Sequence, residues 1–368
     1  MTDPFNRLTW IALRAVPGIG VISFQRLVQR FGQPEAVFQA SYAELASIPK
    51  LSPKIAQAIL NFRAWSEIDR QLKRLADLGG QVVTQTDENF PPALRHIPYP
   101  PPFLYVKGTL EPQDQVAVAV VGTRKLSHYG KRVSYRLGRE LSLKGVTVVS
   151  GLARGIDTAA HQGSLENGGR TLAVLGCGLD IVYPPENKEL YRRISEQGAL
   201  ISEFPPGTPP EAKNFPIRNR LISGLALGVV VVEAGLRSGA LITAQMALDQ
   251  GREVFGVPGP IDAPGSLGPH RLIQEGAKLV QNVDDILSEI SGMVPRLEHT
   301  ANLAGPGGPA PLRVEDPLVA LLSSEPQQIE ELIMASGMAA SEVMTRLTML
   351  ELQGLIRELP GKCYVLAE

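Results

Sequence analysis

The sequence contains only two cysteines, Cys177 and Cys363, among its 368 residues. Two cysteines so far apart make neither a disulfide framework nor a CxxC metal motif, so a reducing compartment fits best. No run approaches the ~18 apolar residues that span a bilayer, and the N-terminus lacks a basic stretch followed by an apolar one. We therefore expect a cytoplasmic protein that has no membrane partner.

Motifs for catalysis and metal binding are also missing. The histidines show no HExxH or other metal-ligand spacing, and the chain has no GxSxG nucleophile turn and no GxxxxGK[ST] phosphate loop. The formal net charge of −1 indicates no particular partner. We therefore expect a protein that is not an enzyme and that uses no metal ion and no cofactor.

The spacing of apolar residues divides the chain into four parts. Residues 1–78 have apolar positions at helical spacing and two hairpin turns, which predicts an all-α domain of paired helical hairpins. Residues 79–290 alternate short apolar runs with helical stretches, which predicts an α/β domain. Residues 291–313 are rich in Gly, Pro and Ala, as linkers are, and residues 314–368 form a last small domain.

The central part of the chain has the alternation that is typical of a parallel sheet. The segments 129–144 and 240–250 are long enough to form crossover helices, which cover both faces of such a sheet. The expected fold class is therefore α/β with a doubly wound parallel sheet. Its expected strands are 116–121, 146–149, 171–175, 228–232 and 253–257.

The last part of the chain predicts a winged helix, with helices over 316–322, 328–336 and 340–353 and a hairpin over 355–365 that turns at Pro360-Gly361. Residues 314–368 hold three Lys or Arg against nine Asp or Glu, a net charge of −6. Residues 1–78 hold ten against six, a net charge of +4. Because a negative surface opposes the counterion release that drives DNA binding, we expect this winged helix to bind protein.

Glycine and arginine follow the first two strands of the expected parallel sheet, where ligands of such sheets bind. Glycine lets the backbone approach a ligand closely, adjacent amides can face a phosphate, and arginine adds a bidentate fork. For each loop alone, an ordinary strand-to-helix turn is the alternative. The candidate residues are Gly122, Thr123 and Arg124 after the first strand, and Ser150, Gly151, Arg154 and Gly155 after the second.

These two loops favour an anion but not a dinucleotide. Neither is a GxGxxG loop, and no acidic residue follows clearly at the position that binds a ribose in dinucleotide folds. Asp157 and His161 lie four residues apart on the helix after the second loop and could form an acid/base pair. The favoured interpretation is a helix-start acid and a histidine that packs or forms a hydrogen bond.

A third group of polar residues precedes the helical stretch 221–227, in the run Lys213 to Arg220. A nucleic-acid base can stack on an aromatic ring while cations hold the flanking phosphates, as in sequence-tolerant single-strand binding. The alternative is a solvated basic loop whose arginines pair with carboxylates. The candidate residues of this run are Lys213, Phe215, Arg218, Asn219 and Arg220.

A fourth loop follows the strand 228–232 and leads into a helix. Its glycines and the start of the helix predict another anion-binding helix terminus, with the Ser238 hydroxyl and the Gly239 amide as donors. Four phosphate-compatible loops are stronger evidence than any one of them, because binding pockets need several convergent groups.

Five segments of the central part together resemble the DprA/Smf family of DNA-processing proteins. The resemblance covers about residues 80–290, and the flanking helical and winged-helix-like parts fit a three-domain member. The segments are GTRKLSHYGKR (122–132), VVSGLARGIDTAAHQGSL (148–165), TLAVLGCGLDIVYPPEN (171–187), NFPIRNRLISGLA (214–226) and VVVEAGLRSGALITAQMAL (230–248).

The resemblance implies an extended Rossmann-like domain that binds single-stranded DNA, forms a homodimer and loads a RecA-type recombinase on incoming DNA during natural transformation. It implies DNA contacts at Gly122, Arg124 and Phe215, with Lys213 as the nearby lysine. The N-terminal part, including PGIG at 17–20, is similar to helix-hairpin-helix or SAM-like modules. Its role is either a phosphate contact through the amides around these glycines or structural docking.

An enzyme is the alternative function, because the Gly-rich strand ends also resemble those of nucleotide-processing phosphoribohydrolases of the same Rossmann-like superfamily. Those enzymes use a PGGxGTxxE loop that contains a catalytic glutamate. This chain has a glycine-bearing loop from Gly235 to Thr243, but Met246 stands where the glutamate would be. A protein-interaction scaffold is a third possibility, in view of the acidic C-terminal part.

Overall fold

The computed structural model describes residues 4–291, 327–352, 356–359 and 363–366, together with Leu318, Leu321 and Leu322. The chain divides into two compact units, Met1–Ala301 and Asn302–Glu368. The first unit contains the N-terminal helices and a large sheet, and the second contains the C-terminal helices and a small sheet. The expected linker, 291–313, lies outside the described residues except for Ser291.

The N-terminal segment is helical, as its apolar spacing predicts. Short helices here begin at residues that favour helix starts: the Ser52 side chain accepts a hydrogen bond from the Ile55 amide, and Pro53 occupies the first helical position. The helices are α1 (Pro4–Ala15), α2 (Val21–Phe31), α3 (Pro34–Gln39), α4 (Tyr42–Ala46), α5 (Pro53–Leu60) and α6 (Trp65–Asp77).

A nine-stranded sheet follows, in the order β1-β2-β6-β5-β4-β3-β7-β8-β9. The five strands expected from the sequence correspond to β3, β4, β5, β7 and β8, and four further strands extend the sheet. The strands are β1 (Gly80–Thr84), β2 (Phe103–Gly108), β3 (Ala117–Val121), β4 (Thr147–Ser150), β5 (Thr171–Leu175), β6 (Ala199–Ser202), β7 (Gly228–Val231), β8 (Glu253–Gly256) and β9 (Lys278–Leu279).

The seven strands from β3 to β9 are parallel, whereas β1 and β2 pair antiparallel at one edge. From β3 the chain runs outward through β4 and β5 to β6, and then returns to the other side of β3 as β7. The order of strands therefore reverses between β3 and β7, which is the point where doubly wound sheets bind ligands. The expected fold class, an extended Rossmann-like α/β sheet, is confirmed.

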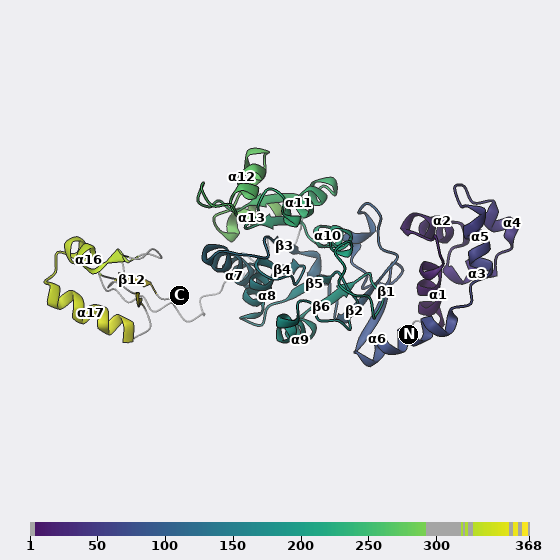
Figure 1. Ribbon diagram of the computed structural model, residues 1–368, viewed down its shortest axis with the longest axis horizontal. Coiled ribbons are helices and arrows are strands. Elements are labelled where there is room, and N and C mark those ends of the chain that lie inside the picture. The colour runs from purple at the N-terminus through teal and green to yellow at the C-terminus, as the bar shows by residue number, and fades with distance from the viewer. Residues whose placement is uncertain are drawn as a thin grey trace. The chain divides into compact units, whose positions relative to one another are not determined.

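Helices cover both faces of the sheet (Figure 1). Strand β3 shows how one buried strand serves two cores, because Val118 and Val120 face α7, α8 and α13 while Ala119 and Val121 face α10, α11 and α12. The helices are α7 (His128–Leu143), α8 (Ile156–Leu165), α9 (Lys188–Gln197), α10 (Asn214–Leu225), α11 (Gly239–Asp249), α12 (Leu267–Gln274) and α13 (Val283–Ile290), with 3₁₀ turns η1 (Pro92–Arg95), η2 (Pro112–Gln115) and η3 (Pro185–Asn187).

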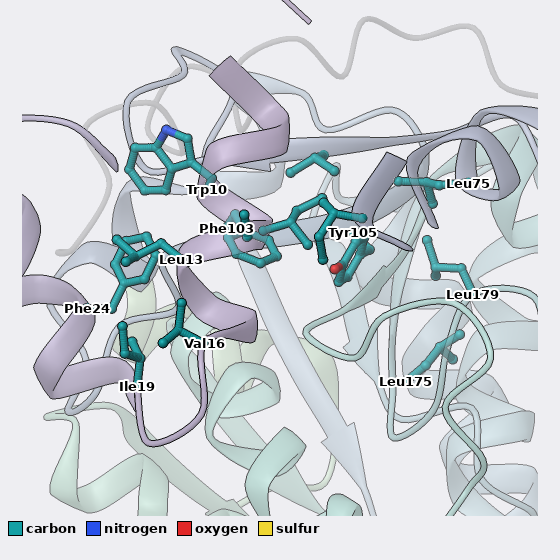
Figure 2. Packing of buried hydrophobic residues seen from close by; sticks show 14 of the residues in the cluster. Trp10, Leu13, Val16, Ile19, Phe24, Leu75, Phe103, Tyr105, Leu175 and Leu179 are labelled. Carbon is teal, nitrogen blue, oxygen red and sulfur yellow. The ribbon is translucent and has the colours of Figure 1, made fainter. Parts of the chain in front are cut away.

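The N-terminal helices share one hydrophobic core with the β2 edge of the sheet. Figure 2 shows Leu13 and Phe24 of the first two helices on one side of Phe103 and Tyr105 of β2, with Leu175 of β5 beyond them. All five side chains are buried in a single cluster. The helices and the sheet therefore belong to one compact unit, and the predicted boundary between residues 78 and 79 stays a prediction.

The second unit contains β10 (Gln327–Gln328), α16 (Ile329–Ser336), α17 (Ala340–Leu352), β11 (Ile356–Leu359) and β12 (Cys363–Leu366). The three strands form an antiparallel sheet in the order β10-β12-β11. Two of the three expected helices and the expected hairpin strands are therefore present. The helix expected over 316–322 and the turn at Pro360-Gly361 lie outside the described residues, apart from Leu318, Leu321 and Leu322.

Within the described residues, no helix has the length and apolar character that crossing a membrane requires.

Candidate functional site

A cavity of about 690 Å³ lies at the carboxyl ends of β3, β4 and β7, where the strand order reverses. We call it the switch-point cavity. Residues from all four predicted loops line it, and eight of the fourteen candidate residues are among them. These eight are Gly122, Thr123, Arg124, Phe215, Arg218, Asn219, Ser238 and Gly239.

The turn after β3 is held between two neighbouring segments. The Thr123 amide donates to the Glu233 carbonyl oxygen over 2.7 Å, and the Ile156 amide donates to the Thr123 carbonyl oxygen over 3.2 Å. A Cβ atom on Gly122 would lie 2.4 Å from the Ile156 side chain and 2.8 Å from the Glu233 carbonyl oxygen. Glycine is therefore required for this close approach, and the turn places Arg124 at the cavity with its side chain exposed.

The loop after β4 is built around a buried carboxylate. Asp157 at the start of α8 accepts hydrogen bonds from the amides of Gly151 (3.1 Å) and Ala153 (3.3 Å). Gly155 has a φ of +87°, and a Cβ atom there would lie 2.2 Å from the Thr123 carbonyl oxygen. Asp157 is thus a structural acid that orders the loop, in agreement with the favoured interpretation from the sequence. Arg154 lies on the surface in an ion pair with Glu186 and does not line the cavity.

Arg218 was expected to hold a phosphate, and the structure corrects this expectation. Its side chain is only 4% exposed, and its Nη1 donates to the carbonyl oxygens of Gly151, over 2.8 Å, and of Val174. The sequence pattern suggested a loop here, but α10 begins at Asn214. Arg218 therefore lies in the second turn of this helix, on its buried side. Burial lowers its pKa to about 10, which leaves it charged at neutral pH. Arg218 therefore holds the loops of the cavity in place, and only 4% of the residue is exposed to a ligand.

Three other candidates also have internal roles. Arg220 forms a largely buried ion pair with Glu203 and does not line the switch-point cavity. The buried Ser150 hydroxyl donates to the Val120 carbonyl oxygen over 2.7 Å. The buried Gly151 leaves space for the Arg218 guanidinium, which a Cβ atom would approach to 2.7 Å. The exposed Lys213 pairs with Glu211 at 2.7 Å and lies outside the cavity lining.

Phe215 lies at the centre of a group of planar side chains. The Arg124 guanidinium carbon is 5.0 Å from the centre of its ring, and that of Arg218 is 5.8 Å away. The Tyr183 ring lies 5.8 Å from it, at 39° to its plane. Such distances allow cation–π attraction and tilted aromatic contact. Phe215, Arg124 and Tyr183 therefore form a partly exposed stacking surface within the cavity.

The loop after β7 supplies a helix terminus, as expected. The Ser238 side chain caps α11 by accepting a hydrogen bond from the Ala240 amide (3.3 Å), and Gly239 is exposed beside it. Arg237 on the same loop is exposed and lines the cavity. Among the residues that the structure describes, neither Arg237 nor Arg124 has an ion-pair partner. Two unpaired cations and a helix N-terminus therefore face the same space.

Arg237 and Tyr183 were missed as site residues. Arg237 stands in the glycine-bearing loop after β7, so its position next to Ser238 was a usable signal. Tyr183 lies in the segment after β5, far from the other candidates in sequence, and only the arrangement of strands brings it to Phe215.

These features define a Rossmann-like protein whose switch-point cavity suits an anionic ligand that has a flat, stackable group. The chain belongs to the family of DNA recombination-mediator protein A, also called DprA or Smf, whose model matches residues 81–291. The model of the DprA winged helix domain matches residues 304–362, which confirms the predicted winged helix. The resemblance found in the sequence is therefore confirmed.

Relatives of known name agree with this assignment. Protein Smf of Synechocystis is 34% identical over 389 residues, which cover 96% of this chain and 97% of that protein. The crystal structure of DprA from Streptococcus pneumoniae matches with a TM-score of 0.68 and 35% identity, over 77% of this chain and 97% of that one. DprA from Helicobacter pylori, whose structure is described for its single-stranded DNA binding mode, matches with a TM-score of 0.52 and 29% identity, over 58% and 97%.

His161 lies beneath the site and is fully buried on α8. Its Nδ1 is 2.7 Å from the Thr171 hydroxyl oxygen. Burial, and to a smaller extent the charge of Arg218, lower the pKa of His161 to about 3. The residue is therefore a neutral, hydrogen-bonded part of the core at neutral pH.

We expect this histidine to make folding sensitive to acid. Below about pH 6.5 the unfolded chain takes up a proton on His161 while the folded chain does not, so stability falls as pH decreases from about 6.5 toward about 3. Between pH 7 and pH 5 this amounts to roughly 2 kcal/mol. Urea unfolding should show a smaller loss over that interval for His161→Asn than for the parent protein.

The exposed His128 at the start of α7 provides the matched control, because His128→Asn makes the same substitution at a surface position. An equal loss of stability in the parent and in His161→Asn would contradict a neutral buried imidazole.

Proposed function

We propose that this protein binds single-stranded DNA in the switch-point cavity and breaks no bond in it. The observation that supports this most directly is the exposed Arg124 guanidinium, 5.0 Å from the centre of the Phe215 ring within a cavity of glycine-lined strand ends. Aromatic rings and guanidinium planes both stack on bases, and cations and backbone amides both bind phosphates. One small region therefore offers partners for both parts of a nucleotide.

The site favours a flexible single strand over a base-paired duplex. A base can reach Phe215 only by leaving its stack, because the ring lies in a cavity and is half-buried. Unstacked bases are available in single strands without the cost of breaking pairs. Arg124 and Arg237 can meet the phosphates on either side of such a base, and neither these contacts nor stacking on Phe215 depends on which base is bound.

The absence of catalysis is part of the proposal. In the alternative, a phosphoribohydrolase, a glutamate would follow the glycine-bearing loop where this chain has Met246. The acid that precedes this loop, Glu233, is buried and accepts hydrogen bonds from the Ser127 amide and hydroxyl. Asp157 is likewise buried and bound to two amides. These two acids therefore have structural partners.

We further propose that the protein forms a homodimer and passes its DNA to a RecA-type recombinase. The family's description as a recombination mediator supports the handover. The sequence indicates that the acidic winged helix binds protein, and a protein partner is compatible with its net charge of −6.

Replacing Arg124 with alanine should weaken binding to single-stranded oligonucleotides to a similar degree for all sequences, because a phosphate contact reads no base. The slope of log K against log salt concentration should become shallower by about 0.7, the value for one phosphate contact on a single strand. Fluorescence anisotropy at several salt concentrations measures both quantities.

Arg132→Ala is the matched control, because its guanidinium lies over the Tyr129 ring at 5.9 Å but outside the cavity lining. Unchanged affinity and slope in Arg124→Ala would refute the site. Steady release of free base from nucleoside monophosphates by the parent protein would favour the phosphoribohydrolase instead.

Deletion of residues 314–368 should leave the affinity for single-stranded DNA within about twofold of the parent value, since a surface of net charge −6 adds no counterion release. The same anisotropy titration tests this. Loss of binding on truncation would mean that the winged helix, and not the switch-point cavity, holds the DNA.

The handover predicts that the full chain speeds assembly of a RecA-type recombinase on single-stranded DNA that is already coated with single-strand binding protein. Arg124→Ala should give much less acceleration at equal concentration, and Arg132→Ala should act like the parent. The proposal of handover fails if the parent protein binds the DNA but leaves the assembly rate unchanged.

A further inference from the structure

A second cavity, of about 810 Å³, lies between the α1–α2 hairpin and the sheet. We call it the hairpin cavity. Its walls come from the PGIG turn and the start of α2, from the loop before β2, from the segment after β6 and from the first turns of α10. Of the four groups of residues predicted at the strand ends, only the third contributes to this cavity, through Pro216, Ile217 and Arg220 of α10. The switch-point cavity does not account for this space.

The start of α2 lines the hairpin cavity and has no side-chain cap. Gly20, at the N-cap position, has no side chain that could cap the helix, and the first residues of the helix, Val21, Ile22 and Ser23, line the cavity. The amides of the first turn have no partner within a helix, and the helix dipole makes this end positive. The exposed Arg14 also lines the cavity and donates to the Ile19 carbonyl oxygen over 2.8 Å.

On the opposite wall of the cavity, Arg220 has a side-chain nitrogen, Nη1, without a hydrogen-bond partner. Arg220 donates from Nη2 to both carboxylate oxygens of Glu203, whereas its Nη1 is buried and has no hydrogen-bond partner. A buried polar atom without a partner is costly, so such atoms commonly mark a place that a ligand or water completes. Glu203 is the one acid that lines the cavity, and Arg220 neutralises it. Arg14 therefore adds net positive charge.

An exposed aromatic side chain stands at the same cavity. Tyr99, on the loop before β2, is 58% exposed and lines the hairpin cavity. Its φ is +57°, a left-handed backbone conformation that is unfavourable for a bulky residue. Strained residues of this kind cluster at binding sites.

The two cavities meet at the first turn of α10. Pro216 lines both of them, with Phe215 on the side of the switch-point cavity and Ile217 on the side of the hairpin cavity. Ile217 is itself 48% exposed. A flexible chain that leaves the stacking surface at Phe215 can therefore pass over Pro216 and enter the hairpin cavity without crossing the body of the protein.

We propose that the hairpin cavity binds the nucleotides that follow those held in the switch-point cavity, so that one single strand of DNA runs over Pro216 from the first cavity into the second. This inference rests on the proposed function. In the hairpin cavity, a base stacks on Tyr99 while a phosphate faces the start of α2 and Arg14. The net charge of +4 over residues 1–78 favours this polyanion over an acidic or neutral partner.

The experiment compares oligonucleotides of two lengths on the full chain. A thymidine oligonucleotide of about 4 nucleotides fits one cavity, and one of about 12 can extend into the next. Tyr99→Ala should bind the longer one about fivefold or more weakly, the loss of one stacked base, and should bind the shorter one like the parent. Tyr99→Phe, which keeps the ring, should restore the binding of the longer oligonucleotide.

Tyr42→Ala is the matched control, because Tyr42 on α4 is 45% exposed and lies outside the cavity lining. Arg14→Gln should weaken the longer complex and make its salt slope shallower, whereas Arg30→Gln on the exposed side of α2 should not.

The failures of the two proposals are distinguishable. If Tyr99→Ala and Arg14→Gln bind both lengths like the parent while Arg124→Ala weakens both, the hairpin cavity does not bind DNA and the inference is overturned, although the first site stands. If Arg124→Ala binds both lengths like the parent, the proposed function itself fails. If Tyr99→Ala weakens both lengths equally and melts at a lower temperature, its effect is structural, and this too overturns the inference.

Discussion

The buried guanidinium of Arg218 fixes the geometry on which the candidate site depends. It joins the carbonyl oxygen at the end of β4 to the one near the end of β5, and it lies beneath the Phe215 ring. A buried charge is tolerated only where polar partners compensate it, and here those partners are the ends of two adjacent strands. The loops after β4 and β5 are thereby held in register with α10. The same arginine requires glycine at position 151, because any side chain there would occupy its place.

This arrangement explains how a protein of formal net charge −1 can have a site for a polyanion. Two of the arginines near the strand ends are neutralised, Arg154 by Glu186 and Arg220 by Glu203. Arg124 and Arg237 are the exposed cations that line the cavity without such a partner among the described residues. Because the reversal of strand order brings the loops after β3 and β7 together, both cations face one space. Local placement, and not overall charge, therefore determines where an anion can bind.

The sequence predicted the features that depend on short-range pattern. The five central strands follow from continuous apolar runs, and Gly122 to Arg124 follow from their place after a strand. The strand β6 was missed because its apolar run, Ala199–Ile201, spans only three residues, and β9 because the strand has only two. For the run from Lys213 to Arg220, the expected phosphate contact of Arg218 differs from its buried position. A sequence shows that cations are present but not which face of a helix they occupy. Because α10 starts at Asn214, Arg218 turns inward. Tyr183 could not be predicted, since only the tertiary fold brings it to Phe215.

The most direct measurement is photo-crosslinking of the full chain to a single-stranded oligonucleotide that contains 5-iodouracil, followed by mass spectrometry of the crosslinked peptides. Halogenated bases crosslink to the aromatic rings on which they stack. We predict crosslinks to Phe215 or Tyr183 of the switch-point cavity, and their loss when unlabelled single-stranded DNA competes. Crosslinks confined to the winged helix or to the face of the sheet under α7 and α13, with full binding retained, would contradict a DNA site at the strand ends.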